Sequence, residues 1–501
     1  LLLSGAEGVA VTEAGEDNLY PLLGSLFFAN TAHMNSILAT RMFKPGDTVD
    51  THRPVHKIIA EYAAADYLAK RIADPTDTLT LGRCLPIIAP NATVRDELRG
   101  LIGWMASLGN KSIQEAAIDL DAYAVLANGD PSQLDTTSKR RLVRCLKEVE
   151  QHDPYFRRGD FWRRFSVAGL FSAEVVDEVR PHISPQSGGQ FRDLILELLE
   201  GSPATAHLAA ELSALCLSVE ANEHTRVMAA QLLLAVPGCS HTANLAQLIF
   251  QADAVSMKVA AKLIQQLGAA QFSTSYLTGY LRVFANLYPR ARRSSESVIG
   301  ARYFLRNLIK TLNYQQTTNL LDALSAKLMC KCGQKAHDCH CRNGISKIIG
   351  LLLDHYCDVS STPHDPQRFW GWVENLNFHS SMSPDRSASV RLLRDDDELR
   401  QGIMQVALGH ETDEERIREI RLEQFEWQSH SGLHFQPQDW EFIAILAFQS
   451  KNVGLWSSFV ATHNHHRKPE DRGPDKLRRL MRAQAFEYPG FLVVWTQKNR
   501  Q

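Results

Sequence analysis

Residues 53–68 read Arg53-Pro54-Val55-His56-Lys57-Ile58-Ile59-Ala60-Glu61-Tyr62-Ala63-Ala64-Ala65-Asp66-Tyr67-Leu68. Apolar side chains recur in and just after this stretch at helical spacing, which predicts an amphipathic helix. The predicted stripe consists of Val55, Ile58, Tyr62, Ala65, Ala69 and Ile72. Proline suits the first turn of a helix because its missing N–H is not needed there. We therefore expect the helix to begin at Pro54, with His56 in its first turn.

His56 is the residue in this helix that we expect to carry chemistry. It shares a predicted face with Ala60, Ala63 and Ala64, whose small side chains let another segment or a ligand come close. A histidine near a helix start can donate a hydrogen bond to a phosphate oxygen. The alternative is a surface or packed histidine without a ligand.

The run HKIIAEYAAADYL resembles the segment, usually written like HRSFQEYLAA, that closes the winged-helix part of NACHT-type STAND NTPases. In that family the histidine opening the segment senses the phosphates of the nucleotide, so the resemblance assigns nucleotide sensing to His56. Glu61 and Tyr62 match the acidic-aromatic pair of the family segment, whereas Ala60 stands where the family has glutamine. The longer run RPVHKIIAEYAAADYLAKR is most similar to the antiviral STAND (Avs-like) group of bacteria.

The resemblance implies a function and a set of partners. STAND proteins are signalling ATPases that switch by nucleotide exchange and form homo-oligomers on activation. The chain would be the C-terminal switch and sensor part of such a protein, recognising a protein trigger such as a phage protein in antiviral defence. No glycine in the chain is followed by lysine, so the Gly-Lys-Ser/Thr ending of a phosphate-binding loop is absent. We therefore expect the module that binds ATP or ADP to lie upstream of Leu1, and this part alone not to be an enzyme.

Composition sets further limits on partners and location. The 501 residues include 54 Lys or Arg and 56 Asp or Glu, for a net charge of −2. This balance does not call for a nucleic-acid or membrane partner, and no apolar run reaches membrane-spanning length. The nine cysteines, an odd number with four in one short segment, fit a reducing cytoplasm better than a secreted disulfide framework.

The expected fold is all-α, with a winged-helix remnant and a small β-hairpin followed by a HEAT-like helical-repeat solenoid. The hairpin is predicted over residues 41–49 around the Pro45-Gly46 turn, an irregular loop being the alternative. The predicted domains are a winged-helix remnant of a NACHT/STAND module at 1–75, a helical linker or arm at 76–190, HEAT-like repeats at 191–330, and a Cys-rich loop with a C-terminal helical domain at 331–501.

The repeat prediction depends on an internal similarity. Residues 227–233 align with residues 258–264 at a shift of 31, and residues 191–199 have a similar apolar spacing. Small alanines in mid-helix allow close packing of a neighbouring helix, as in repeats that hide their apolar faces by stacking. The same pattern also fits a second class of function, a stand-alone HEAT-like scaffold for protein partners without nucleotide switching.

Four cysteines form the candidate metal site: Cys330, Cys332, Cys339 and Cys341. Two Cys-x-Cys pairs can supply four thiolates to a tetrahedral structural zinc. The usual knuckle has two residues between its cysteines, so reduced cysteines in a polar loop remain the alternative. A zinc-dependent nucleic-acid binder is the third class of function that this cluster raises.

Three other clusters have structural explanations that we prefer. The aromatic and basic residues at 155–164 can contact nucleic acid, but they also suit packing between helices with arginines in surface ion pairs. The acidic run 395–398 suggests a nuclease only superficially, because carboxylates at a helix start stabilise the helix dipole. His463, His465 and His466 are expected in a polar, solvent-exposed loop.

Overall fold

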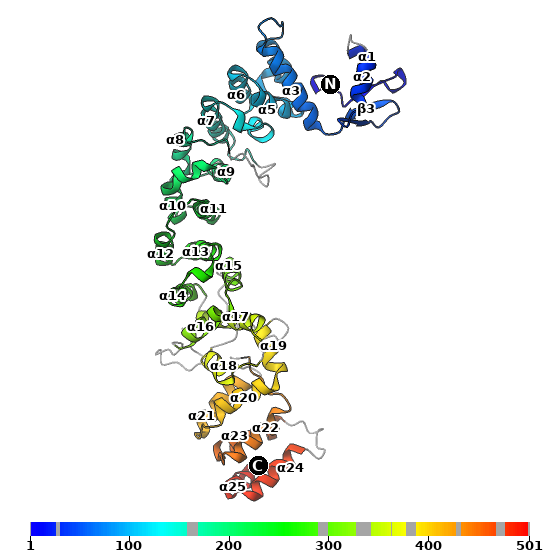
Figure 1. Ribbon diagram of the computed structural model, residues 1–501. Helices are drawn as coiled ribbons and strands as arrows, with labels where there is room; N and C mark the ends of the chain where they lie inside the picture. The colour runs from blue at the N-terminus through cyan, green and yellow to red at the C-terminus, as the bar shows by residue number, and fades with distance from the viewer. Residues whose placement is uncertain are drawn as a thin grey trace. The chain divides into compact units, whose positions relative to one another are not determined.

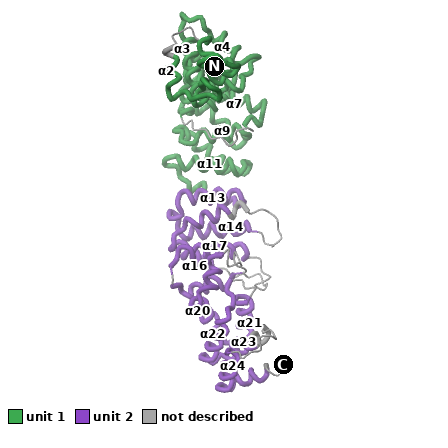
Figure 2. The backbone as a smooth tube through the Cα atoms, turned by 90° about the vertical axis from the view of Figure 1, so that its right-hand side faces the viewer, with its two compact units in different colours: residues 1–244 green, residues 245–501 purple. Residues whose placement is uncertain are grey.

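The computed structural model describes residues 2–26, 31–157, 169–288, 299–326, 342–361, 363–376, 387–426, 432–466 and 476–498. The chain divides into two compact units, Leu1–Asn244 and Leu245–Gln501 (Figure 2). The described residues are mostly helical and include one small sheet, which confirms the mainly helical class with a minor β element. The boundary between the units falls inside the range predicted for the repeats.

The sheet lies at the N-terminal end of unit 1. Its strands are β1 (Val9–Ala10), β2 (Phe43–Pro45) and β3 (Thr51–Pro54), in the order β1-β3-β2. Both neighbouring pairs are antiparallel, with Val9 opposite His52 and Lys44 opposite Arg53. The helices α1 (Leu23–Leu26) and α2 (Thr31–Leu38) complete a small core with β1, formed by Val9, Leu23, Met34 and Leu38.

The hairpin is present, but its second strand lies further along the chain than predicted. β2 ends at Pro45, and the chain then turns through residues 46–50 before β3 begins at Thr51. Gly46 donates its N–H to the Thr51 carbonyl oxygen at 2.8 Å. A β-carbon on Gly46 would overlap the Thr51 side chain, so this close approach requires glycine.

The predicted helix start at Pro54 is wrong. Pro54 is the last residue of β3 and lies opposite Phe43, and the Val55 N–H still donates to the Met42 carbonyl at 2.9 Å. The helix, α3, spans Lys57–Ala73, and His56 is its N-cap residue in an extended conformation. Pairing with β2 thus holds the chain extended for three residues beyond the start that proline alone suggested.

The remaining helices of unit 1 pack in chain order. α3 packs on α5, α5 on α6, α6 on α7, α9 on α11 and α10 on α11. Their bounds are α4 (Leu81–Ile88), α5 (Arg99–Leu108), α6 (Lys111–Asn128), α7 (Thr136–His152), α8 (Val176–Val179), α9 (Gln190–Leu198), α10 (Ala209–Leu217) and α11 (Glu223–Leu234). The following helix, α12, spans Thr242–Gln251.

In unit 2, helices also contact the next helix but one along the chain. One series runs α13, α15, α17, α19, and another runs α14, α16, α18, α20, α22, α24 (Figure 1). Their bounds are α13 (Ala254–Leu267), α14 (Thr274–Ala285), α15 (Ile299–Ile309), α16 (Tyr314–Ser325), α17 (Asn343–Val359), α18 (Pro366–Val373), α19 (Ala388–Asp395), α20 (Asp397–Leu408), α21 (Glu414–Ile420), α22 (Asp439–Gln449), α23 (Val453–His466), α24 (Lys476–Glu487) and α25 (Pro489–Lys498).

The two similar segments form corresponding parts of α11 and α13. Ala229 and Ala230 in α11, and Ala260 and Ala261 in α13, are all at most 1% exposed. The similarity extends to the helix starts, where Asn222 caps α11 and Asp253 caps α13 with side-chain oxygens. Helices α11 and α13 therefore share a local design, with a capping side chain and a pair of buried alanines at corresponding positions. Among the helices that the structure describes, none combines the length and apolar character that crossing a membrane requires.

Candidate functional site

His56 lies between the end of β3 at Pro54 and the start of α3 at Lys57. Its side chain is exposed and makes no capping hydrogen bond to the helix, while its carbonyl oxygen accepts from the Ile59 N–H at 3.1 Å. An exposed imidazole at the positive end of a helix of 17 residues is placed to meet an anionic group. At the N-cap, the side chain of His56 makes no hydrogen bond to the backbone of α3.

Glu61 anchors this end of α3 against α5. It is 8% exposed, and a β-carbon on Gly100 of α5 would overlap its carboxylate. Lys57, one turn earlier, lies 3.4 Å from the Glu61 carboxylate and remains largely exposed. Glycine at position 100 thus makes room for a buried acid, and the lysine compensates its charge. His56 directly precedes Lys57, the exposed member of this ion pair.

The predicted apolar stripe of α3 is only partly correct. Ala65 and Ala69 are buried as expected, but Ile58 is 53% and Tyr62 46% exposed. The helix instead buries Glu61 and Leu68. Tyr62 rests edge-on against Trp104 of α5, with 5.2 Å between ring centroids. Of the alanines expected to share a face with His56, Ala60 and Ala64 are half-buried and Ala63 is exposed.

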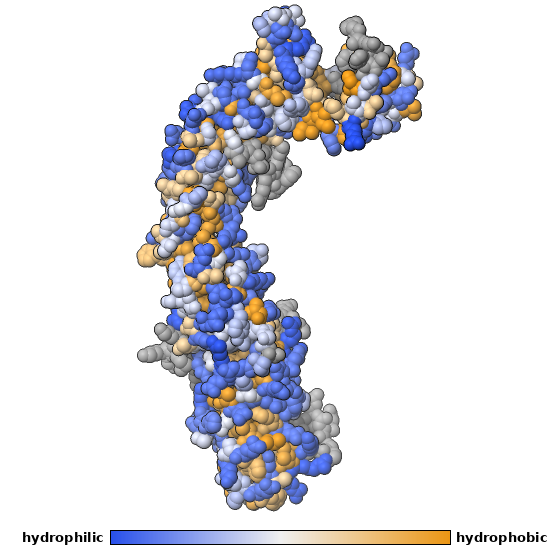
Figure 3. All heavy atoms as spheres, in the orientation of Figure 1, coloured by the Kyte–Doolittle hydropathy of each residue, from blue (hydrophilic) through white to orange (hydrophobic). Residues whose placement is uncertain are grey.

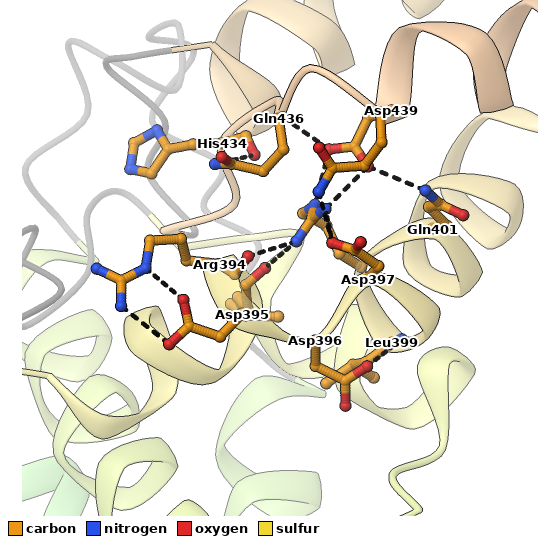
Figure 4. Close-up of polar contacts among 12 residues, drawn as sticks. Arg394, Asp395, Asp396, Asp397, Leu399, Gln401, His434, Gln436 and Asp439 are labelled. Carbon is orange, nitrogen blue, oxygen red and sulfur yellow. Dashed lines mark hydrogen bonds and ion pairs between the residues drawn. The ribbon is translucent and has the colours of Figure 1, made fainter.

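The acidic run at the start of α20 has structural partners (Figure 4). Asp396 caps α20 by accepting from the Leu399 N–H at 2.9 Å. Asp395 pairs with Arg394, and this hydrogen bond lowers the pKa of the Asp395 carboxyl group. Hydrogen bonds from Gln438 and Arg400 lower the pKa of Asp397. These contacts agree with a role at the helix start and give no arrangement suited to a nuclease.

Sequence reasoning missed the centre of this network, Arg400. It is fully buried and donates to Asp439, also fully buried, with 2.7 Å between Arg400 Nε and Asp439 Oδ2. Its Nη1 donates to the carbonyl oxygens of Leu393 and Arg394. The guanidinium therefore joins the end of α19 and the starts of α20 and α22. The pattern of α20 alone gives no sign of a partner 39 residues away.

The candidate zinc ligands Cys330, Cys332, Cys339 and Cys341 lie outside the described residues, and the site stays a prediction. The prediction of a loop for His463, His465 and His466 is wrong, because α23 continues to His466; the side chains of these histidines lie outside the described residues. Among the side chains that the structure does describe, no group of three or more histidine, cysteine, aspartate or glutamate residues is placed to hold a metal ion.

The aromatic and basic run at 155–164 is described only as far as Arg157. That arginine is 4% exposed and pairs with Glu197 of α9, with 2.9 Å between Nη2 and Oε2. The prediction of a surface ion pair is therefore wrong for Arg157, because its side chain is buried where it meets Glu197. Residues 158–164 lie outside the described part of the chain.

A feature that the total charge conceals is the uneven distribution of charge along the chain. Residues 254–321 contain nine Lys or Arg and a single acidic residue, Glu296. Counting charge in windows along the sequence would have found this segment. The chain matches no protein-family model, no curated protein and no solved structure.

Proposed function

We propose that the chain is the C-terminal switch and sensor part of a NACHT-type STAND signalling ATPase, with a protein trigger, such as a phage protein, as its partner in antiviral defence. In this proposal the segment around His56 responds to the nucleotide, and the following helices form a HEAT-like solenoid that recognises the trigger. ATP or ADP would be held by a module upstream of Leu1. Trigger binding would favour an open, self-assembling state by population shift.

One observation carries the proposal. The segment that resembles the family sequence follows a short antiparallel sheet, and its histidine is exposed at the N-terminal end of α3. Two helices, a hairpin and a following helix are the parts that a winged-helix module requires. The Glu61 and Tyr62 pair fixes α3 to α5 through Gly100 and Trp104, so a displacement of His56 would be passed to α5.

The helical part supports the sensor role. Helices in unit 2 contact the next helix but one, and α11 and α13 share side-chain caps and buried alanines at a spacing of 31 residues. Stacked helix pairs provide extended surfaces for protein partners. The same observation favours the second candidate, a stand-alone protein-binding scaffold without a nucleotide switch.

Amide hydrogen exchange in the natural full-length protein tests the nucleotide switch. With ADP added, the proposal predicts slower exchange for the amides of residues 57–60 at the start of α3. The start of α11, residues 223–226, provides a matched control at a helix that also begins with an exposed histidine, His224. Equal exchange with and without ADP at α3, or a natural gene that encodes no Gly-Lys-Ser/Thr loop upstream, would favour the scaffold.

A further inference from the structure

We propose that the surface formed by α13 and α15 in unit 2 binds single-stranded nucleic acid. The proposal is independent of the nucleotide switch and of the trigger. It rests on the charge of these helices, on the exposure of three of their basic side chains and on one exposed tyrosine of α15.

The helices in this part of the chain carry positive charge without compensation. The sequences of α12, α13, α14 and α15 contain no aspartate or glutamate. The chain as a whole has a net charge of −2, so its remaining parts carry the excess of acid. A phosphate backbone is attracted to such a region because no carboxylates repel it.

The described basic side chains on the two helices have room for a ligand. α13 and α15 pack side by side. Arg306 and Lys310 are exposed at α15 and its C-terminal end, and Lys262 is partly exposed on α13. Within the described part of the chain, no carboxylate forms an ion pair with any of these three. Lys258 adds a fourth positive charge one turn before Lys262.

Two arginines of α7 show how a basic helix can be neutralised. On α7, Arg141 pairs bidentately with Asp119, and Arg144 pairs bidentately with Glu178. A helix rich in lysine and arginine is thus not enough to make a surface for a polyanion. Lys262, Arg306 and Lys310 differ from these two arginines because none of the three forms an ion pair with a carboxylate in the described structure.

Two acidic residues that follow these helices in the sequence are also occupied. Asp322 of α16 accepts from Arg368 and from Trp372 Nε1, the latter at 2.7 Å. Asp354 of α17 accepts from the hydroxyl groups of Ser387 and Ser389, both at 2.6 Å. These carboxylates therefore bind side chains of α18 and of the start of α19. Neither carboxylate is committed to the basic groups of α13 and α15.

Tyr303 favours nucleic acid over other polyanions. It is 66% exposed on α15, three residues before Arg306 and seven before Lys310, so all three lie on one side of the helix. An exposed ring among basic side chains can stack on a base while the cations contact phosphates. In the described part of α13, α14 and α15, Tyr303 is the single exposed large hydrophobic residue, whereas a membrane surface requires several that insert together.

The test measures binding of the whole chain to a fluorescent oligothymidylate of about 20 nucleotides at increasing salt. The variant Lys262→Gln/Arg306→Gln/Lys310→Gln removes three charges from the surface. Its control, Arg416→Gln/Arg418→Gln/Arg478→Gln, removes three exposed charges from α21 and α24 of the same unit. Circular dichroism establishes that both variants keep their helical content.

We expect the surface variant to bind at least tenfold more weakly and the slope of log affinity against log salt to fall by about 2, since each single-strand phosphate contact contributes about 0.7. The control variant should match the parent. Tyr303→Ala should weaken binding at least fivefold, and Tyr303→Phe should restore it, because stacking needs the ring and not the hydroxyl.

Several outcomes would overturn the assignment. They are no binding of the oligonucleotide at low salt, an equal loss in the control variant, and displacement of the oligonucleotide by polyglutamate as effectively as by an unlabelled strand. Binding to phosphatidylserine vesicles without binding to the oligonucleotide would also overturn it, by showing that the partner is a membrane surface.

Discussion

Asp439 holds Arg400 inside unit 2, with neither side chain exposed and 2.7 Å between Asp439 Oδ2 and Arg400 Nε. Asp439 opens α22, and Arg400 lies in the first turn of α20. Two carbonyl oxygens, those of Leu393 and Arg394, accept from the same guanidinium. The buried ion pair therefore joins three helices, α19, α20 and α22.

Replacing one partner should be far more harmful than breaking an exposed pair. Asp439→Ala leaves Arg400 charged and buried, so we expect a loss of about 3–5 kcal/mol in the free energy of unfolding of unit 2. Glu419→Ala, which removes the partner of the exposed Arg416, should cost less than about 1 kcal/mol. Urea denaturation followed by tryptophan fluorescence measures both. Similar losses in the two variants would show that burial does not determine the effect.

Gly189 should tolerate no side chain. Its φ is +96°, and a β-carbon there would overlap the carboxylate of Glu150, which accepts from the Phe191 N–H at 2.7 Å and so caps α9. Gly189→Ala should lower stability by about 2 kcal/mol through backbone strain and loss of this cap. Gly188→Ala is the control because its β-carbon would meet nothing within 4 Å. Thermal unfolding that is equally affected in both variants would refute this role of Gly189.

Asp77 should titrate at unusually low pH. Hydrogen bonds from Arg71, at the end of α3, lower the pKa of Asp77 to about 2. Because the folded-state pKa is below the unfolded value of about 3.9, the stabilisation is complete above pH of about 4 and is lost as pH falls toward 2. Carboxyl-carbon NMR should show a midpoint near 2 that rises in Arg71→Gln. An unchanged midpoint in that variant would show that Arg71 is not the cause.

Local pattern was sufficient for the mainly helical class and for a turn at Pro45-Gly46. It could not place β3, because the strand position depends on pairing of His52 with Val9, far earlier in the chain. Likewise, helical periodicity placed Ala65 and Ala69 in the core but could not foresee that Gly100 of α5 makes space for Glu61.

The candidate site was predictable as a position but not in its geometry. The resemblance selected His56, and the structure places it at the N-cap of α3 instead of inside the first turn. Arg400 could not be selected, since a charged residue within a charged run resembles a surface residue until Asp439 is brought beside it. The excess of basic residues around α13 and α15 was missed for another reason. The net charge of the whole chain is near zero because acidic residues elsewhere cancel it.

The most direct test of the proposed switch is the amount of ADP that the natural full-length protein retains after purification when His56 is replaced by alanine. His224→Ala is the control, because His224 is likewise an exposed histidine near the start of a helix. If His56 senses the nucleotide, His56→Ala should lose most of the bound ADP or raise basal activation, while His224→Ala matches the parent. Equal ADP content and equal basal activation in all three proteins would contradict the assignment of His56 as the sensor.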